Sequence, residues 1–441
     1  MRMRRMKKIF CGIALAACCL SASGQSGTNS PYSQYGFGVL ADQTSGFNRG
    51  MNGVGIGFRE HNQVNFINPA SYSAVDSLTF ILDAGISGQI TNFNENGKKK
   101  NAKNANFEYA VAAFRMARHL GMSFGVLPFT NVGYSYKSSS MLDTDNTVGY
   151  INQYTGSGGL HQFYVGLGWE PVKNLSLGAN VSYVWGDYSR SISNAYDEGS
   201  GTDYSSINSL SKVYSATVNS YRMDIGLQYR LPLGKKNSVI VGATYSPGHK
   251  LGADAQCTVT SVNRLTSVAS PTPYKVEDAL ELPTMLSAGL SYNYNRQLKI
   301  GVDYSLQQWS KTSFPVYEVR NNTPTYALSD SYFSDRHKIS VGGEYMKGEM
   351  VRGFFNRLRY RAGVSYATPY VKINGNDGPK ELSVSAGFGI PIVNTINNRS
   401  LLNISAQWGR LSGKGLITEN TFRINIGMTF NERWFWKWKV E

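Results

Sequence analysis

Apolar and polar residues alternate one by one along much of this chain. In one clear row, six apolar residues alternate with four polar or small ones: Leu175, Leu177, Ala179, Val181, Tyr183 and Trp185 against Ser176, Gly178, Asn180 and Ser182. Comparable rows begin at Tyr221, Leu286, Leu298 and Leu402. Because successive side chains of a β-strand point to opposite faces, these rows predict strands with one apolar face and one polar face.

Fourteen such strands are predicted, over residues 78–92, 105–118, 120–137, 160–172, 174–191, 213–231, 236–258, 280–295, 297–311, 333–347, 354–368, 380–392, 399–412 and 420–430. They are about 11–20 residues long, whereas strands of soluble proteins average about 5–6 residues. Aromatic residues recur where the apolar rows end, at Tyr183, Trp185, Tyr229, Tyr245, Tyr294, Tyr345, Tyr366 and Trp408. A soluble β-sandwich would also alternate, but strand length and an aromatic girdle favour a membrane barrel.

The connections between these strands are short and long in turn. Short ones cover residues 118–119, 172–173, 231–235, 295–296, 347–353 and 392–398, and long ones cover 138–159, 192–212, 259–279 and 311–332. The contrast fades at the last loop, residues 413–419. Bacterial outer-membrane barrels have short periplasmic turns and longer outer loops. We therefore expect an all-β fold, a 14-stranded antiparallel transmembrane β-barrel over residues 78–430, in the outer membrane of a Gram-negative bacterium.

The first 24 residues are typical of a signal peptide. A basic start (Arg2, Arg4, Arg5, Lys7 and Lys8) precedes an apolar stretch and the small residues Ala22, Ser23 and Gly24. Cleavage there would leave Gln25 first and lower the net charge from +15 to +10, since five basic and no acidic residues are removed. Leu15-Ala16-Ala17-Cys18 also fits a lipobox, which would make Cys18 a lipidated N-terminus.

Two segments flank the predicted barrel. Residues 25–77 are rich in Gly, Asn, Ser and Pro, and we expect them to form a hatch in the lumen, with a periplasmic tail as the alternative. Residues 431–441 contain Trp434, Phe435, Trp436 and Trp438, which suits a periplasmic tail at the membrane interface. The last strand ends at Phe430 and resembles the signal that the barrel-assembly machinery recognises, so we expect that machinery as a partner.

No pattern in the sequence predicts catalysis. The five histidines lack metal-ligand spacing and no nucleophile motif accompanies them, so we expect neither an enzyme nor a metal or other cofactor. The basic residues are spread along the chain apart from Lys98-Lys99-Lys100, which suits a solvated loop rather than a nucleic-acid patch. Cys257 would be the one cysteine left after ordinary cleavage, so it could form no internal disulfide.

The segment Gly50-Met51-Asn52-Gly53-Val54-Gly55-Ile56-Gly57, followed by Asn65-Phe66-Ile67-Asn68-Pro69-Ala70, resembles the N-terminal region of FadL-type transporters. That resemblance implies a fourteen-stranded barrel with an N-terminal hatch and a kinked third strand that opens the wall sideways. It places Asn68, Pro69 and Ala70 at the ligand passage. PorV-type secretion barrels share this layout.

The third predicted strand contains Gly125, Pro128 and Phe129. Proline cannot donate to a strand ladder and is normally excluded from central strands. Pro128 beside Gly125 therefore predicts a gap in the wall, with an ordinary bulge as the alternative.

Charged residues occupy inward positions of several strands: Arg222, Asp224, Lys299, Asp303, Lys338, Glu344, Arg359, Arg361 and Arg423. They could form a network that holds the hatch, or a site for an anionic head group, since six are cations and three are anions.

The sequence leads us to expect passive transport of hydrophobic, long-chain fatty acid-like compounds with lateral exit into membrane lipid. Outer loops with Phe314, Tyr317, Tyr326 and Tyr332 would capture the ligand. A polar-solute porin and a secretion or scaffold barrel are the alternatives.

Overall fold

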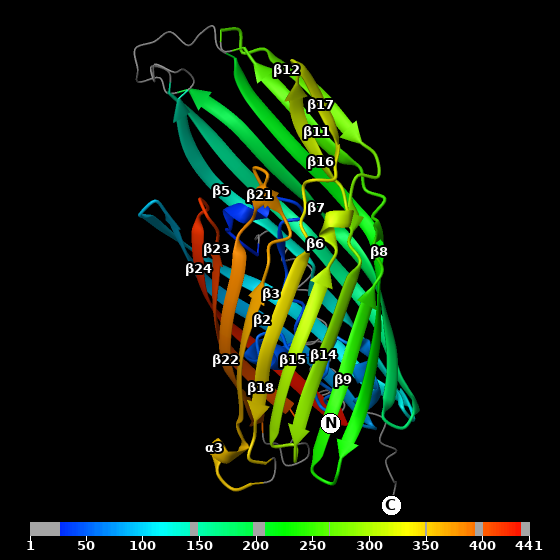
Figure 1. The fold of residues 1–441 in the computed structure, drawn as a ribbon. Coiled ribbons are helices and arrows are strands. Elements are labelled where there is room, and N and C mark those ends of the chain that lie inside the picture. The colour runs from blue at the N-terminus through cyan, green and yellow to red at the C-terminus, as the bar shows by residue number, and fades with distance from the viewer. Residues whose placement is uncertain are drawn as a thin grey trace, which may run out of the picture.

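The computed structural model describes residues 27–141, 149–196, 208–263, 265–348, 351–392 and 400–433. Within these residues the chain forms a closed antiparallel β-barrel (Figure 1). Fourteen positions make up its wall, with β4 and β5 sharing one: β2 (Thr79–Glu95), β3 (Lys98–Ala117), β4 (Leu120–Pro128), β5 (Thr130–Met141), β6 (Gly149–Val172), β7 (Leu175–Tyr196), β8 (Ser209–Leu233), β9 (Asn237–Ser246), β14 (Met285–Tyr294), β15 (Leu298–Gln307), β18 (Arg336–Tyr345), β19 (Arg359–Ala367), β22 (Lys380–Ile392), β23 (Ser400–Ser412) and β24 (Thr418–Arg433). Strand β2 pairs with β24 and closes the wall. The predicted fold class is therefore confirmed.

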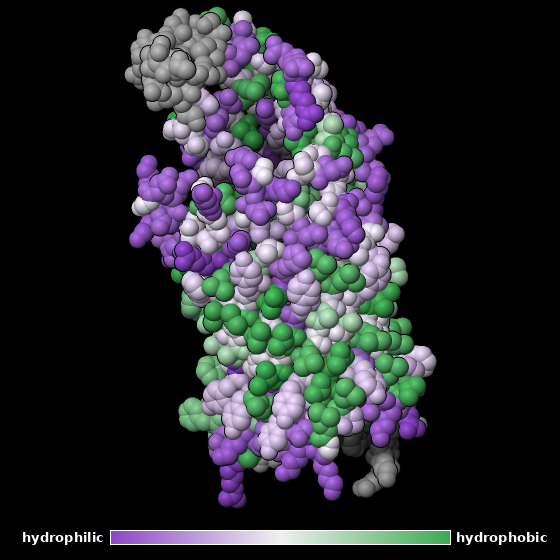
Figure 2. All heavy atoms as spheres, viewed as in Figure 1, coloured by the Kyte–Doolittle hydropathy of each residue, from purple (hydrophilic) through white to green (hydrophobic). Residues whose placement is uncertain are grey.

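The apolar rows of the sequence lie on the outside of the barrel. In β24, Phe422, Ile424 and Ile426 are 44–48% exposed, whereas Asn425 between them is 3% exposed and faces inward. Figure 2 shows that apolar side chains gather in a band around the lower part of the molecule, below a polar upper part. Soluble monomers rarely expose an apolar surface of this size, so this band must be in contact with lipid.

Four connections that the sequence predicts as long loops contain strand instead. Residues 138–141, 149–159, 192–196 and 209–212 belong to β5, β6, β7 and β8, which form a one-sided extension above the apolar band (Figure 1). Residues 259–279 and 311–332 contribute to two hairpins, β11 (Ala255–Val262) with β12 (Ala269–Val276) and β16 (Phe314–Arg320) with β17 (Thr323–Ser329). The prediction of loops was wrong because strands with water on both faces need no apolar alternation.

Three other boundaries also differ from the prediction. The seventh strand, predicted over 236–258, ends at Ser246 because Pro247 and Gly248 follow, and the chain then forms β10 (His249–Lys250), which pairs with β13 (Glu281–Leu282). The predicted strand 354–368 begins with the helix α3 (Phe354–Arg357). The lysines at 98–100, expected in a loop, start β3 after a tight turn in which Asn96 and Gly97 have φ of 47° and 82°. That Asn-Gly pair is a strong hairpin signal.

An N-terminal segment, residues 27–77, lies inside the barrel (Figure 1). It contains η1 (Pro31–Gln34), β1 (Val39–Leu40), α2 (Gly46–Gly50) and η2 (Pro69–Ala74). Its apolar residues pack on one another, as in the buried cluster of Phe47, Met51, Val54 and Phe58. No helix among the described residues is long and apolar enough to cross a membrane. The predicted signal peptide, with Cys18, and the tail aromatics from Trp434 onward lie outside the described residues.

Aromatic side chains pack together at the mouth of the barrel. The ring of Phe37 lies 5.5 Å from that of Trp309 and 6.0 Å from that of Phe314, and Tyr332 stacks on Phe314 at 4.8 Å. Phe314 is therefore core, not part of a ligand-capturing surface loop as the sequence suggested. The short elements η4 (Trp309–Lys311), β20 (Lys372–Ile373) and β21 (Asn376–Asp377) lie in the connections around this cluster.

Candidate functional site

The wall of the barrel is interrupted between β3 and β5. Strand β3 pairs with β4 only as far as Ala110 opposite Val126. Beyond that point β5 continues along β6, from Val132 opposite Gly158 onward, while the first part of β3 pairs with β2. No ladder joins β3 to β5 among the described residues, and the edge of β5 pairs instead with the short strand β1, at Val39–Asn131 and Leu40–Thr130. The hydrogen-bonded wall is therefore interrupted at this level, and we call this break the lateral opening.

Proline explains where the third strand breaks. Strand β4 ends at Pro128, and Phe129 separates it from β5. The Phe129 N–H donates to the Leu160 carbonyl of β6 at 2.7 Å. Since backbone groups alternate between the two edges of a strand, the N–H that Pro128 lacks would have pointed toward β3. Pro128 therefore leaves that edge without a donor. Gly125 lies earlier, inside the regular ladder opposite Val111 and Tyr164.

A β-bulge in β3 lies at the same level. The pairing with β2 skips Glu108, whose neighbours Tyr109 and Phe107 face Gly85 and Ile86. Bulges redirect side chains locally, and here Glu108 points inward to Arg49 at 2.7 Å. Both edges of the opening are thus made of irregular strand.

The N-terminal segment runs across the upper part of this opening. The side-chain amides of Asn29 and Asn104 of β3 are hydrogen-bonded at 2.7 Å, and the Gly133 N–H of β5 donates to the Ser33 hydroxyl at 3.1 Å. Ser30 also donates to the buried Glu419 carboxyl at 2.7 Å. Burial raises the pKa of Glu419 to about 7, although the bond from Ser30 opposes that shift.

A cavity of about 390 Å³ lies between the N-terminal segment and the wall. Part of its apolar lining lies beside the lateral opening and consists of Phe66, Phe107, Leu127, Pro128, Phe129 and Tyr164, while other apolar lining residues, such as Ile56, Met285, Val371 and Leu411, lie elsewhere around the cavity. The remainder of its lining is mostly polar, as at Gln162, Asn180, Ser182, Thr244 and Ser287. The size suits a small organic molecule.

The Asn-Pro-Ala motif starts the helix η2. The Asn68 side chain caps it by accepting from the Ala70 N–H at 3.1 Å, and Pro69 occupies the first turn, where no N–H is needed. The same amide donates to the carbonyls of Ile56 and Leu227 at 3.0 and 3.1 Å. Asn68 thereby joins two parts of the N-terminal segment to β8.

Glycines of the wall allow η2 to approach the strands closely. A Cβ at Gly178 of β7 would lie 2.3 Å from the Pro69 carbonyl carbon, and a Cβ at Gly121 of β4 would lie 1.9 Å from the Tyr72 carbonyl oxygen. Neither position leaves room for a side chain. The small residues on these strands therefore allow the N-terminal segment to lie directly against the wall.

Comparison with known proteins identifies relatives at two levels. The family model described as BamG matches residues 5–441, nearly the whole chain. The chain belongs to the BamG family. No curated protein matches.

Solved structures share the fold of this BamG-family barrel. The toluene transporter TodX of P. putida is 14% identical, with a TM-score of 0.60 and coverage of 88% of this chain and 98% of that chain. The toluene transporter TbuX of Ralstonia pickettii is 16% identical, with a TM-score of 0.56 and coverage of 87% and 97%. A FadL homologue of Pseudomonas aeruginosa is 14% identical, with a TM-score of 0.57 and coverage of 88% and 98%. The resemblance to FadL-type transporters is thus confirmed for the fold.

The predicted luminal charges fall into two groups in the BamG-family barrel. In the group beside the cavity, Arg222 pairs with Asp224 at 2.8 Å, and Asp303 accepts from the N–H groups of Gly55 and Ile56 at 2.6 and 2.9 Å. The Asp303 carboxylate therefore binds the backbone of the N-terminal segment, whereas Arg222 and Asp224 pair with each other.

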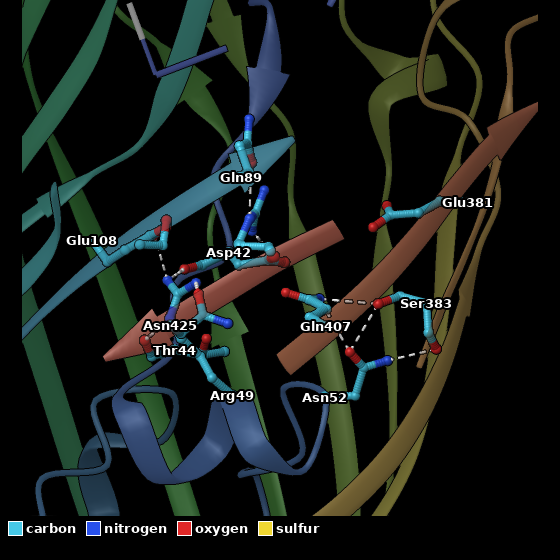
Figure 3. Close-up of polar contacts among 12 residues, drawn as sticks. Asp42, Thr44, Arg49, Asn52, Gln89, Glu108, Glu381, Ser383, Gln407 and Asn425 are labelled. Atoms are coloured by element: carbon cyan, nitrogen blue, oxygen red, sulfur yellow. Dashed lines mark hydrogen bonds and ion pairs between the residues drawn. The ribbon is translucent and has the colours of Figure 1, made fainter. Parts of the chain in front are cut away.

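Further contacts on this side bind the N-terminal segment to the wall through side chains (Figure 3). Asp42 lies 3.3 Å from Arg423 and 3.5 Å from Lys338. Burial would raise the pKa of Asp42, but these two cations hold it below its usual range. Asn52 donates to the Ser383 carbonyl at 2.8 Å.

The second group lies deeper and is fully paired. Glu344 accepts from Arg361 at 2.7 Å and lies 3.3 Å from Lys299 and 3.5 Å from Arg359. Glu60 of the N-terminal segment joins this group through Lys299 at 2.5 Å. Three cations thus share two carboxylates, and the contact with Glu60 binds the N-terminal segment to the wall.

Sequence reasoning singled out Pro128, Phe129 and the charged residues of the cavity wall but missed its other residues. Leu127, Tyr164 and Phe66 belong to one buried cluster, and Gln162 and Ser182 look like ordinary inward polar residues of a strand. Only the register of β4, β6 and β7 brings them together. A signal for Leu127 was its position next to Pro128, which marks the break. Nothing in the sequence distinguishes Gln162.

Proposed function

We propose that this BamG-family chain is a passive transporter of small hydrophobic compounds in the outer membrane of a Gram-negative bacterium. The observation that carries the proposal is the cavity, part of whose apolar lining lies beside the lateral opening between β3 and β5. A ligand that enters the cavity would leave between these strands into lipid. Diffusion down a gradient needs no nucleotide and no catalytic group.

The ligand class follows from the size and lining of the cavity. About 390 Å³ holds a monoaromatic molecule or part of an acyl chain. The structural neighbours TodX and TbuX are named as toluene transporters, and the FadL resemblance implies fatty acid-like compounds. Membrane lipids would receive the ligand. The barrel-assembly machinery would insert the chain by recognising β24, which carries Phe430.

Replacing Pro128 tests lateral exit. Pro128→Val restores an N–H toward β3 and should let β4 continue along it, so the opening should narrow. We expect uptake of labelled toluene by cells that express the variant to fall several-fold, with unchanged amounts of folded barrel. Pro232→Val is the matched control, because Pro232 lies opposite Ser238 at the β8–β9 turn, away from the opening. Unchanged uptake by folded Pro128→Val would contradict lateral exit.

A second function is favoured by the extension above the apolar band. The ends of its hairpins expose Leu265 (71%), Val268 (59%) and Val319 (58%), which neither lipid nor the protein core covers. Leu265 and Val268 belong to one turn, between β11 and β12, and exposed apolar side chains that lie together mark interaction surfaces. The barrel would then be a scaffold for another outer-membrane or secreted protein. Purification in mild detergent should retain such a partner, and Leu265→Ser with Val268→Ser should release it.

A further inference from the structure

Four cations lie on the outward face of the barrel, at the upper ends of neighbouring strands. They are Lys99 and Lys103 of β3, Lys380 of β22 and Arg410 of β23, and all four are exposed. This end of the barrel also carries the extension and is opposite most of the short turns, so it is the outer end. We call these four residues the basic surface.

The strand register brings the basic surface together. Directly opposite residues of antiparallel strands share a face, and one row of them runs across Arg410 of β23, Asn420 of β24, Asn92 of β2 and Asn101 of β3. Lys103 is two residues from Asn101, on the same face. Lys380 is a diagonal neighbour of Arg410, which is opposite Leu382, so these two cations are about 7–8 Å apart at their Cβ atoms.

The basic surface adjoins the top of the apolar band. Trp408, Phe422 and Ile90 are opposite one another on β23, β24 and β2, and they are 39%, 48% and 42% exposed. Lys103 is opposite Ile90, and Arg410 is two residues beyond Trp408, about 7 Å along the strand. Since the apolar row is in contact with lipid, the cations lie at the level of the lipid head groups, which long basic side chains can reach.

The charge on this face has one sign. Among the described residues, no Asp or Glu occupies an outward position at the upper ends of these five strands. The acidic residues there belong to inward rows: Glu381 pairs with Arg336 at 3.0 Å, and Glu419 is buried. An ordinary solvated face carries both signs, so this face suits an anionic partner.

The opposite side of the barrel differs. On β7 the outward position beyond Trp185 is the exposed Asp187, and it is opposite Thr217 of β8. The basic surface is therefore a local feature and not a ring around the whole barrel. Figure 2 shows the polar upper part, from which the β2–β3 hairpin projects at the left, above the apolar band.

Phosphate is the group that this surface complements best. Lysine and arginine form charge-assisted hydrogen bonds with phosphate oxygens, and the amides of Asn420, Asn92 and Asn101 add neutral donors between them. Basic clusters beside a membrane bind anionic lipid head groups. The level of the cations favours a lipid over an acidic protein, because the acyl chains of a bound lipid would lie against Phe422 and Ile90.

We infer that the basic surface binds the phosphate groups of an anionic lipid in the outer leaflet. The acyl chains of this lipid pack on the apolar row below, while its phosphates lie between β3 and β22. The inference goes beyond the proposed transport function and does not depend on which compound occupies the cavity.

Native mass spectrometry of the full chain in an uncharged detergent tests the basic surface. The probes are bisphosphoryl lipid A, monophosphoryl lipid A and inorganic pyrophosphate. We expect bisphosphoryl lipid A to bind several-fold more tightly than monophosphoryl lipid A, and pyrophosphate to bind far more weakly than either. Each cation near an anionic surface raises binding about fivefold, so Lys103→Gln with Arg410→Gln should weaken bisphosphoryl lipid A binding about 25-fold.

Two control variants separate this site from general charge attraction. Lys235→Gln with Lys236→Gln removes the same charge from exposed residues of the β8–β9 turn, at the other end of the barrel, and should leave lipid binding unchanged. Lys103→Arg with Arg410→Lys keeps both charges and should also bind like the unchanged chain. All four substituted positions are exposed, so folded mobility on gels should be unaffected.

Three results would overturn the inference. Equal lipid binding by the folded Lys103→Gln, Arg410→Gln variant would show that these cations are only solvated. An equal loss in the Lys235→Gln, Lys236→Gln variant would show that the lipid responds to net charge alone. Pyrophosphate binding as tight as that of bisphosphoryl lipid A would show that the surface holds a free anion and that the acyl chains contribute nothing.

Discussion

At the scale of single residues, buried polar side chains hold the N-terminal segment against the wall. Asp303 accepts two backbone N–H groups of this segment, and Arg49 pairs with Glu108 at the bulge of β3. Charge-assisted hydrogen bonds of this kind are stronger than neutral ones. The segment is therefore fixed at separate points, and the contact between Ser30 and Glu419 fixes the part nearest the lateral opening.

The contact between Ser30 and Glu419 should depend on pH. Glu419 precedes the apolar row that begins at Phe422, so it lies above the membrane band. Burial raises its pKa from the usual 4.5 to about 7. Between these values the folded state binds more protons than the unfolded state, so stability falls as pH rises through this window. Hydrogen exchange should show protection of residues 28–34 about tenfold or more lower at pH 8 than at pH 5.

Glu419→Gln provides the control for this pH effect. The neutral amide keeps an acceptor for Ser30 and cannot ionise, so the difference in protection between pH 5 and pH 8 should disappear. The same pH dependence in the variant would show that another group is responsible.

Single residues were predictable from sequence where covalent chemistry limits the backbone, or where strand alternation determines which side chains face the lumen. Pro128 marked the break because proline lacks an N–H, and the strand does end there. Gly125, chosen with it, lies in regular ladder. The positions of Gln162 and Ser182 in the cavity lining were not predictable, because which inward polar residues meet at one cavity depends on the folded register.

At the scale of elements, the helix η2 packs closely on the wall strands because the wall residues that face it are glycines, which have no side chain. Gly178→Ala would bring a Cβ within 2.3 Å of the Pro69 backbone, so either η2 or β7 must shift. We expect a loss of about 1–3 kcal/mol of stability, as for other overpacked sites. The temperature at which the barrel loses its folded mobility on gels should fall. Gly409→Ala on β23, where a Cβ meets nothing within 4 Å, should leave that temperature unchanged.

Strands in the membrane were more predictable than strands above it. Because lipid lies outside the barrel and the lumen is polar, apolar and polar residues must alternate along β24 and β7. This alternation can be recognised in the sequence. The hairpin β16–β17 has no such constraint, because water reaches much of both faces. Its polar and aromatic residues therefore suggested a loop.

At the scale of the whole molecule, the closed wall, the luminal segment and the lateral opening form one arrangement. The segment occupies part of the lumen, and the cavity between it and the wall is the space for a ligand. Strand number and closure were predictable from the alternation and the even count. The extension was not, and it is where the scaffold function would reside.

Mass spectrometry of small molecules extracted from the mild-detergent-purified chain tests the central claim most directly. Transport predicts that small apolar or amphipathic compounds co-purify with the native barrel and are reduced in a Phe129→Ala variant, because Phe129 lines the cavity at the opening. An empty cavity together with a stoichiometric protein partner would contradict transport and support the scaffold function.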